Sequence, residues 1–304
     1  LSTNQGFRSI VPLEGVNNEY IYYYLNASKA EAEKLASGST FKEISGTNLK
    51  QLPIPLPPLN EQKRIVAKLD AIMPRIEAVK ARLDKVPDIL KRFRQSVLTA
   101  AVTGKLTEQW REEHPEVESA NGSFSEVSEK LSENYLNVFN ETQYYLLPET
   151  WIYAPLERLG EIIGGGTPSK SKPEYWEGDI PWISPKDMKI SQIKHGIDFI
   201  SQSAVKELIP TGSILFVVRG MILAHTFPVA LSLNQVTINQ DMKGITPIKE
   251  VDPKFLLLVF QNIQNRILGY IKEATHGTLR LEMAIIQTFA FPLPPLSEQK
   301  EIVR

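Results

Sequence analysis

The stretch PLPPLNEQKRIV at residues 55–66 returns almost unchanged as PLPPLSEQKEIV at residues 292–303. A second matching pair precedes them, STNQGFRSIVP at residues 2–12 and TINQDMKGITP at residues 237–247. A segment of about 65 residues therefore occurs twice in the same internal order, and chance is a poor explanation for two shared motifs at near-constant spacing. The whole chain is organised around this internal repeat.

The first copy runs into a long helical pattern that begins at Leu59. Apolar residues recur in alternating steps of four and three for about five heptads, which is the spacing of a coiled-coil seam. The seam consists of Ile65, Leu69, Ile72, Ile76, Val79, Leu83, Val86, Leu90, Phe93 and Val97. We expect Pro74 and Pro87 to kink or break this helix and Gly104 to end it.

A seam of this length predicts a partner helix, because an apolar stripe is unstable in water. The second copy offers one candidate, since its own helix starts near Pro294. A second chain could supply the partner instead, and packing of the helix on its own domain is the remaining alternative.

The repeat and the changes of composition predict an α+β fold with five segments. Each copy carries a helical stretch between its motifs, and short apolar runs predict strands at Ile180–Ile183, Ile214–Val218 and Val236–Ile238. The segments are the C-terminal half of a first domain (1–52), a long helix (53–108), a polar linker (109–147), a complete domain (148–290) and the start of a second helix (291–304). The linker is rich in Glu, Ser and Asn, with a helical piece expected around Ser125–Leu136.

The composition excludes several classes of function. The 304 residues contain no cysteine, which rules out disulfides, Cys-ligated zinc and a cysteine nucleophile. The four histidines are not spaced for a helical metal site, so we expect no metal, and no apolar run is long enough for a membrane span. The net charge of −1 means that any nucleic-acid contact depends on a local basic patch.

At this point the layout resembles a known family, the specificity subunits of type I restriction-modification enzymes. Domain, long helix, domain and helix start follow one another, and LPPLxEQKxIV opens each helix. DILKRFRQSVLTAAVTGKLTEQWR at residues 88–111 is similar to that family's central conserved region. LPETWIYAPLERLGEIIGGGTPSKSKPEYWEGDIPWISPKDM at residues 147–188 is similar to the opening of its target-recognition domain.

The resemblance implies target-recognition domains of mixed or antiparallel β structure, joined by long helices that form a coiled coil. It implies that two such domains each read half of a split site in double-stranded DNA. Two modification subunits, which bind S-adenosylmethionine and methylate adenine, would dock on the chain together with a restriction subunit. The chain itself would then be a cytoplasmic, non-catalytic subunit without a cofactor.

The sequence departs from the family pattern in lacking the first half of domain one and the body of the second helix. A truncated subunit and a half-subunit that dimerises both remain open. It also lacks a [DNS]PP[YFW] methyltransferase motif and a helicase Walker pair, which indicates that catalysis belongs to partner subunits. A stand-alone nuclease or methyltransferase and a scaffold that binds no DNA are the alternatives.

Two segments of the second domain carry candidate DNA contacts. GGGTPSKSK at residues 164–172 lacks the GK[ST] of a phosphate-binding P-loop, so it is either a flexible turn or a loop against the DNA backbone. Its candidate residues are Thr167, Ser169, Lys170 and Lys172. WISPKDMK at residues 182–189 offers Ser184, Lys186 and Asp187 for base readout, and its acid-x-Lys step lacks the second acid of a nuclease.

Three further stretches are basic. Arg219 follows a predicted buried strand in FVVRGMILAHT and suits a forked guanine or phosphate contact, although such an arginine is often a surface ion-pair partner. His276, Thr278 and Arg280 lie in the repeated turn, which could equally be a structural corner. LKRFRQ at residues 90–95 is typical of a solvated helix face, or of a face near DNA or a partner.

Overall fold

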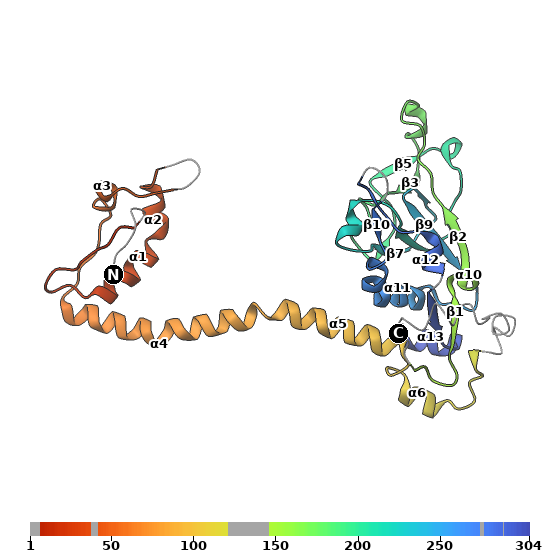
Figure 1. Ribbon diagram of the computed structural model, residues 1–304, viewed down its shortest axis with the longest axis horizontal. Coiled ribbons are helices and arrows are strands. Elements are labelled where there is room, and N and C mark those ends of the chain that lie inside the picture. Colours follow the sequence, from red (N-terminus) through yellow and green to blue (C-terminus); the bar gives the residue numbers. More distant parts are fainter. Residues whose placement is uncertain (1–6, 38–41, 121–145, 274–276, 288) are drawn as a thin grey trace. The chain divides into compact units, whose positions relative to one another are not determined.

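The computed structural model of the chain describes residues 7–37, 42–120, 146–273, 277–287 and 289–304. They form two compact units that divide between Leu90 and Lys91, and each is described by itself (Figure 1). The predicted α+β class, with mixed and antiparallel sheets and long helices, is confirmed. No helix in the described part of the chain is long and apolar enough to cross a membrane.

The first unit is helical. Its elements are α1 (Asn18–Ala27), α2 (Lys29–Lys34), α3 (Gly46–Leu49), α4 (Leu59–Leu83) and the start of α5 (Val86–Val102). A small core of Tyr20, Ile21 and Val66 joins α1 to α4. Asn17 caps α1, because its side chain accepts a hydrogen bond from the Tyr20 backbone N–H at 2.8 Å.

The long helix forms with one interruption. Pro74 lies inside α4, so the expected break at that residue does not occur. The break falls at Asp84 and Lys85, and Pro87 is then the second residue of α5, where a missing backbone N–H costs no helical hydrogen bond. Gly104 adopts a φ of 78° just beyond the end of α5, as predicted for a helix stop.

The predicted seam is largely uncovered. Ile65 and Leu69 are partly buried against the first unit. The other eight seam residues, from Ile72 to Val97, have exposed fractions between 40% and 65%. No described residue covers this stripe, which supports the expectation of a partner helix and not the alternative of packing on its own domain.

The second unit is built on two mixed sheets. The larger has the strand order β2-β9-β6-β7-β4, and the smaller has the order β5-β3-β8. Pairs β4–β7 and β3–β8 are parallel, and all other pairs are antiparallel. Two antiparallel pairs, β1–β12 and β10–β11, complete the unit.

The strands are short. They are β1 (Ile152–Pro155), β2 (Gly160–Gly164), β3 (Ile180–Ile183), β4 (Gln192–Ile193), β5 (Asp198–Ile200), β6 (Ile214–Val217), β7 (Val229–Ser232), β8 (Thr237–Ile238), β9 (Met242–Pro247), β10 (Lys272–Glu273), β11 (Leu279–Arg280) and β12 (Ala290–Leu293). The helices are α6 (Glu108–Glu113), α10 (Leu156–Leu159), α11 (Pro253–Leu268), α12 (Met283–Gln287) and α13 (Leu296–Ile302), with 3-10 turns η1 (Pro173–Tyr175), η2 (Gln202–Ala204) and η3 (Met221–Ala224). The three predicted strands are confirmed as β3, β6 and β8.

Helix α11 supplies the main core contact, because it packs on β6 and β7 (Figure 1). Phe260 on this helix stacks on Phe216 of β6 with ring centroids 5.4 Å apart, and it lies 5.2 Å from Phe291 of β12. The end of α5 joins the same core through Ala101 and Val102. The segment predicted to open a second helix also takes part, since β12 pairs with β1 before α13 begins.

The predicted segment boundaries stay a prediction, and part of the linker lies outside the described residues, including the helical piece expected around Ser125–Leu136. One difference between the two copies is clear. In the second copy, β9 is hydrogen-bonded between β2 and β6. The matching residues 7–12 of the first copy form no strand, because the described part of the first unit contains no strand to pair with them.

The glutamine of the EQK motif anchors the long helix in the first copy. Gln62 is 1% exposed, and its Oε1 accepts a hydrogen bond from the backbone N–H of Asn17 at 2.8 Å. Its Nε2 donates to the carbonyl oxygens of Pro57, at 2.8 Å, and Gly15, at 3.3 Å. One side chain therefore ties the first turn of α4 to the N-cap of α1.

Gln299 makes the same three contacts in the second copy. It is fully buried, and its Oε1 accepts from the backbone N–H of Asp252, the N-cap of α11, at 2.7 Å. Its Nε2 donates to the carbonyls of Glu250, at 3.0 Å, and Pro294, at 2.9 Å. The repeated PPLxEQK motif thus encodes one repeated clamp between two helices.

Glu298, the neighbour of that glutamine, is a second buried polar centre. Its Oε1 accepts from Thr107 Oγ1 at 2.6 Å and from Arg111 Nη1 at 2.5 Å, and its Oε2 accepts from Trp151 Nε1 at 2.8 Å. Arg111 also donates to the Gly104 carbonyl at 2.7 Å. This carboxylate holds the turn after α5 against the start of α13, where a buried charge needs such partners.

We expect Gln299→Ala to lower the free energy of unfolding of the second unit by roughly 2–4 kcal/mol, because one N–H and two carbonyl groups lose their buried partner. Urea unfolding followed by tryptophan fluorescence measures this change. Gln235→Ala, at an exposed position of the same unit, serves as the control and should change stability by less than about 0.5 kcal/mol. Equal stability of the two variants would contradict the role assigned to Gln299.

Candidate nucleic-acid interface

Three cationic residues of the second unit lie opposite one another on adjacent backbone segments, two of them on strands β10 and β11 and one just after β6. Arg219 forms an antiparallel bridge with Arg280, and Arg280 pairs with Lys272 in the β10–β11 ladder. Directly opposed residues of antiparallel strands place their side chains on the same face. Arg219, Arg280 and Lys272 are all exposed, and we call them the cationic row.

Backbone hydrogen bonds fix this register. The Gly220 N–H donates to the Leu279 carbonyl at 3.0 Å, and the Leu281 N–H donates to the Val218 carbonyl at 2.9 Å. Arg219 and Arg280 are therefore a non-hydrogen-bonded pair, in which side chains lie closest. The structure thus brings together two residues that were singled out separately in the sequence.

The cationic row is poorly balanced by negative charge. Among the described residues, the row forms an ion pair between Arg219 and Asp241, whose nitrogen and oxygen lie 3.8 Å apart, and the arginine side chain is 48% exposed. Like charges placed directly opposite on a sheet repel each other. An anion that binds across the row would relieve this repulsion, and the phosphates of a nucleic acid are such anions.

The glycine-rich loop is held by the sheet next to it. A Cβ on Gly165 would lie 2.1 Å from the Asn239 carbonyl oxygen, so only glycine fits there. Trp182 Nε1 donates to the Gly166 carbonyl at 2.9 Å, and Thr167 Oγ1 donates to Gln240 Oε1. A structural turn therefore explains the glycine at position 165, and the Thr167 hydroxyl already donates a hydrogen bond inside the domain.

The polar side chains of the glycine-rich loop differ in whether they have hydrogen-bond partners within the domain. Lys172 Nζ donates to the Tyr175 hydroxyl at 3.1 Å and lies 4.8 Å from the centre of that ring, and the hydrogen bond raises the pKa of the Lys172 ammonium. Ser169 is exposed and pairs with Ser171 at 2.7 Å. Lys170 is exposed. Contact of this loop with DNA stays a prediction.

The Asp187 carboxylate accepts hydrogen bonds from residues of its own loop and the segment next to it. Its Oδ2 accepts from the Ser184 backbone N–H and hydroxyl, both at 2.8 Å, and its Oδ1 accepts from the Ile197 N–H at 2.9 Å. Ser184 is itself buried, whereas Lys186 is exposed. Of these three predicted base readers, Lys186 alone has a side chain that faces solvent and takes no part in this turn.

The last predicted group lies beside the cationic row. Thr278 is partly buried next to β11, and Arg280 belongs to the row itself. His276 lies outside the described residues. Lys272 was missed in the sequence, because its position opposite Arg280 depends on the register of β10 and β11, which residue type alone does not indicate.

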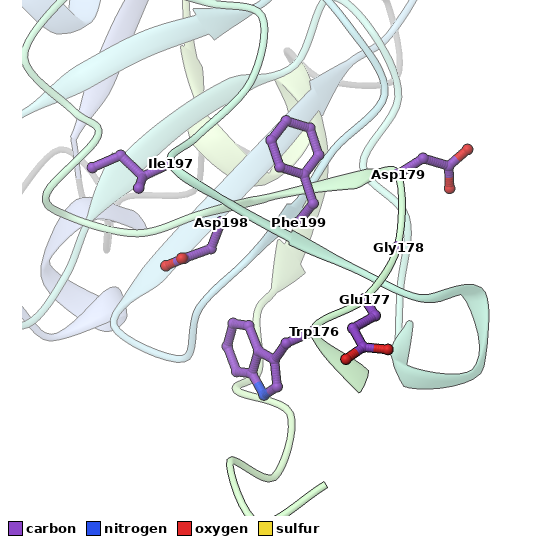
Figure 2. Close-up of a pocket in the computed structure, with 7 residues that line it drawn as sticks. All are labelled: Trp176, Glu177, Gly178, Asp179, Ile197, Asp198 and Phe199. Carbon is purple, nitrogen blue, oxygen red and sulfur yellow. The ribbon is translucent and has the colours of Figure 1, made fainter. Parts of the chain in front are cut away.

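A shallow pocket of about 680 Å³ lies elsewhere on the unit and has the opposite charge. Its lining residues include Glu177, Asp179, Asp198 and Trp176 (Figure 2). Asp187 does not line it, so the structure does not join Asp179 to the acid-x-Lys step. The described residues contain no cluster of three or more His, Cys, Asp or Glu side chains that could hold a metal ion.

The chain is similar to proteins of one family. A family profile described as "Type I restriction modification DNA specificity domain" matches residues 1–88 and 148–304. The chain is 30% identical over 291 residues to the type I restriction enzyme EcoR124I/EcoR124II specificity subunit of Escherichia coli, covering 94% of this chain and 61% of that protein. It is 27% identical over 298 residues to the EcoKI specificity subunit of Escherichia coli K12, covering 94% and 57%. The chain spans less than two thirds of either relative.

Solved structures share the fold. The HsdS subunit from Thermoanaerobacter tengcongensis aligns with a TM-score of 0.56 at 20% identity, over 95% of this chain and 61% of that one. A chain from a structural study of complex assembly in the type I R-M system aligns with a TM-score of 0.53 at 22% identity, over 94% and 59%. These structures show the fold, and the family profile confirms the predicted resemblance.

The architecture is that of an internally repeated protein with an α+β domain and a long helix, in which each copy clamps the start of a helix through one buried glutamine. Within that class, the chain belongs to the family of type I restriction-modification specificity subunits. Its second unit carries the strand edge and loops described above.

Without a bound anion the cationic row should cost stability. We expect Arg280→Gln to raise the free energy of unfolding by a few tenths to about 1 kcal/mol at low salt, because two like-charge contacts are removed. The gain should shrink as salt screens the charges. Denaturant unfolding at two salt concentrations measures it, with the exposed residue change Lys186→Gln as control. A loss of stability in Arg280→Gln would contradict the expected repulsion.

Proposed function

We propose that this chain recognises one or both halves of a split site in double-stranded DNA as the specificity subunit of a type I restriction-modification enzyme. The observation that carries the proposal is the cationic row, three exposed cations in register on one face of the second unit. Membership of the family supports it, as does the poor balance of the row by carboxylates.

The cationic row and the loops would contact different parts of the DNA. Lys272 and Arg280 are suited to phosphate contacts, which fix position but carry little sequence information. Arg219 at the end of β6 and Lys186 on its loop are suited to base edges, where arginine and lysine donate to guanine O6 and N7. Lys170 and Ser169 would contact the backbone from the glycine-rich loop.

Methylation and cleavage would belong to partners. We infer that two modification subunits, each binding S-adenosylmethionine, and a restriction subunit assemble with this chain in the cytoplasm. The chain would hold no cofactor and perform no chemistry itself. Membership of the family supports this division of roles, and the carboxylates of Glu298 and Asp187 accept structural hydrogen bonds.

The uncovered seam would pair with a second long helix. The internal repeat indicates which residues this partner helix would contain. In the second copy the end of α5 contacts α11, where Asn262 Nδ2 donates a hydrogen bond to Thr99 Oγ1 at 3.1 Å. The equivalent helix of the first copy, α1, has no such helix end against it in the described part. Glu61, the counterpart of Glu298, pairs within the described residues with the nearby Arg64, and its side chain is 43% exposed.

We infer that a helix end with the chemistry of residues 98–111 covers α1 and Glu61 in the assembled subunit. It would come either from the continuation of the second copy's helix or from a second chain in a half-subunit dimer. Both sources provide the antiparallel partner that the heptad seam needs.

We expect this chain, with its cognate modification subunits, to select a split consensus from random DNA, and Arg280→Gln with Lys272→Gln to weaken binding to that consensus by roughly tenfold or more at low salt. Selection followed by titration at two salt concentrations measures both effects. The matched control removes two cations away from the row, Lys105→Gln with Lys254→Gln, and should bind as the native chain does.

Specificity should persist while affinity falls with salt, because phosphate contacts are salt-dependent and base contacts much less so. Binding without any sequence preference would overturn the proposed function. Native affinity in the row variant would leave DNA recognition standing but remove the row from the interface.

A further inference from the structure

A groove of about 500 Å³ lies in the second unit, apart from the cationic row and the pocket of Figure 2. Its walls are α5, α11 and the segments 188–191 and 225–229. Every lining residue belongs to the second unit, so the groove does not depend on how the two units are arranged. We call it the α5 groove.

The α5 groove is cationic. Lys91 and Arg94 come from α5, Lys189 from the loop after β3, and His225 from the end of η3. All four side chains are exposed, and no Asp or Glu is found among the described lining residues. None of the three permanent cations has a carboxylate oxygen of a described residue within 4.0 Å. These positive charges can therefore attract an anion from outside the chain.

The remaining walls are suited to phosphate and sugar. Gln261 and Gln264 of α11 line one side of the groove. Their side-chain amide groups can donate hydrogen bonds to phosphate oxygens, as arginine and lysine do, but they carry no charge. The apolar floor is closed, because Phe227 is fully buried and Leu98 is 8% exposed. The one phenylalanine ring in the described lining is buried, and the exposed lining side chains are mainly cationic or amide groups, so the chemistry favours the backbone of a nucleic acid over its bases.

The α5 groove and the cationic row lie at two ends of one short segment. Arg219 belongs to the row, η3 (Met221–Ala224) follows it, and His225 lines the groove. β11 of the row also contacts η3. A polyanion bound to the cationic row and extending along this segment would therefore reach further cations in the α5 groove.

We propose that the α5 groove binds the sugar-phosphate backbone of DNA next to the half-site read by the second unit, and so contributes affinity that does not depend on sequence. The inference rests on the proposed function and extends it to the basic stretch LKRFRQ. Lys91 and Arg94 lie on one face of α5, three residues apart, and the groove would hold the backbone between this face, Lys189 and α11.

The test uses the full chain with its cognate modification subunits and compares the native protein with Lys91→Gln/Arg94→Gln. The probes are a duplex with the selected site and a duplex of scrambled sequence, each titrated between about 50 and 200 mM salt. Lys105→Gln/Lys254→Gln removes the same charge outside the groove and is the matched control. Thermal unfolding confirms that all three proteins are folded.

We expect the groove variant to lose roughly tenfold affinity on both duplexes, with the preference for the selected site unchanged, and the slope of log K against log salt to fall by about two. A slope and affinity equal to the control overturn the inference and leave the proposed function intact. A selective loss on the selected site also overturns it, since the groove would then read sequence.

Two further outcomes separate the causes of failure. Native DNA binding by the groove variant together with loss of the modification subunits would assign the groove to a protein partner and overturn the inference. A native chain that shows no preference between the two duplexes would overturn the proposed function, whatever the groove variant does.

Discussion

The starts of α4 and α13 each depend on a buried glutamine that fixes the helix to the domain before it. Gln62 and Gln299 each present one acceptor and two donors to three backbone groups, and each holds the N-cap of the domain helix. A glutamine in this position is satisfied only if both helices begin where they do, because amide geometry allows little tolerance. The helix direction is therefore set relative to the core of the same unit.

Around this clamp the two copies diverge. In the second copy Glu298 binds Thr107, Arg111 and Trp151, so the turn after α5 is anchored to the same place where the next helix starts. In the first copy Glu61 lies partly exposed and the seam of α4 is uncovered. Identical motifs thus have different surroundings, and the difference marks the surface on which we expect a partner helix.

Much of the fold could be predicted from sequence, because it rests on local patterns. Apolar runs between Gly and Pro identified β3, β6 and β8, and the repeat showed that α11 and α1 are equivalent helices. The helix was expected to kink or break at both prolines, and α4 runs through Pro74 without a break. Only the break before Pro87 occurred, since a proline in a first turn sacrifices no hydrogen bond.

The site was harder to predict, because its residues are selected by pairing across strands and by hydrogen bonds within loops. Arg219 and Arg280 are 61 positions apart in sequence, and Lys272 joins them only through strand register. Asp187 and Thr167 looked available in sequence, yet their polar atoms are used inside the domain. Residue type indicates what a side chain can do, whereas its partners decide whether it is free to do so.

We propose that clamped reading units on a long helix recognise a split DNA site whose gap is set by helix length. Duplicating residues 75–81 adds one heptad to α4 while keeping the seam in phase, and lengthens the helix by about 10 Å, or about three base pairs. DNA selected by this variant with its modification subunits should contain the same half-site sequences with a longer gap. An unchanged gap, or altered half-site sequences, would contradict the account.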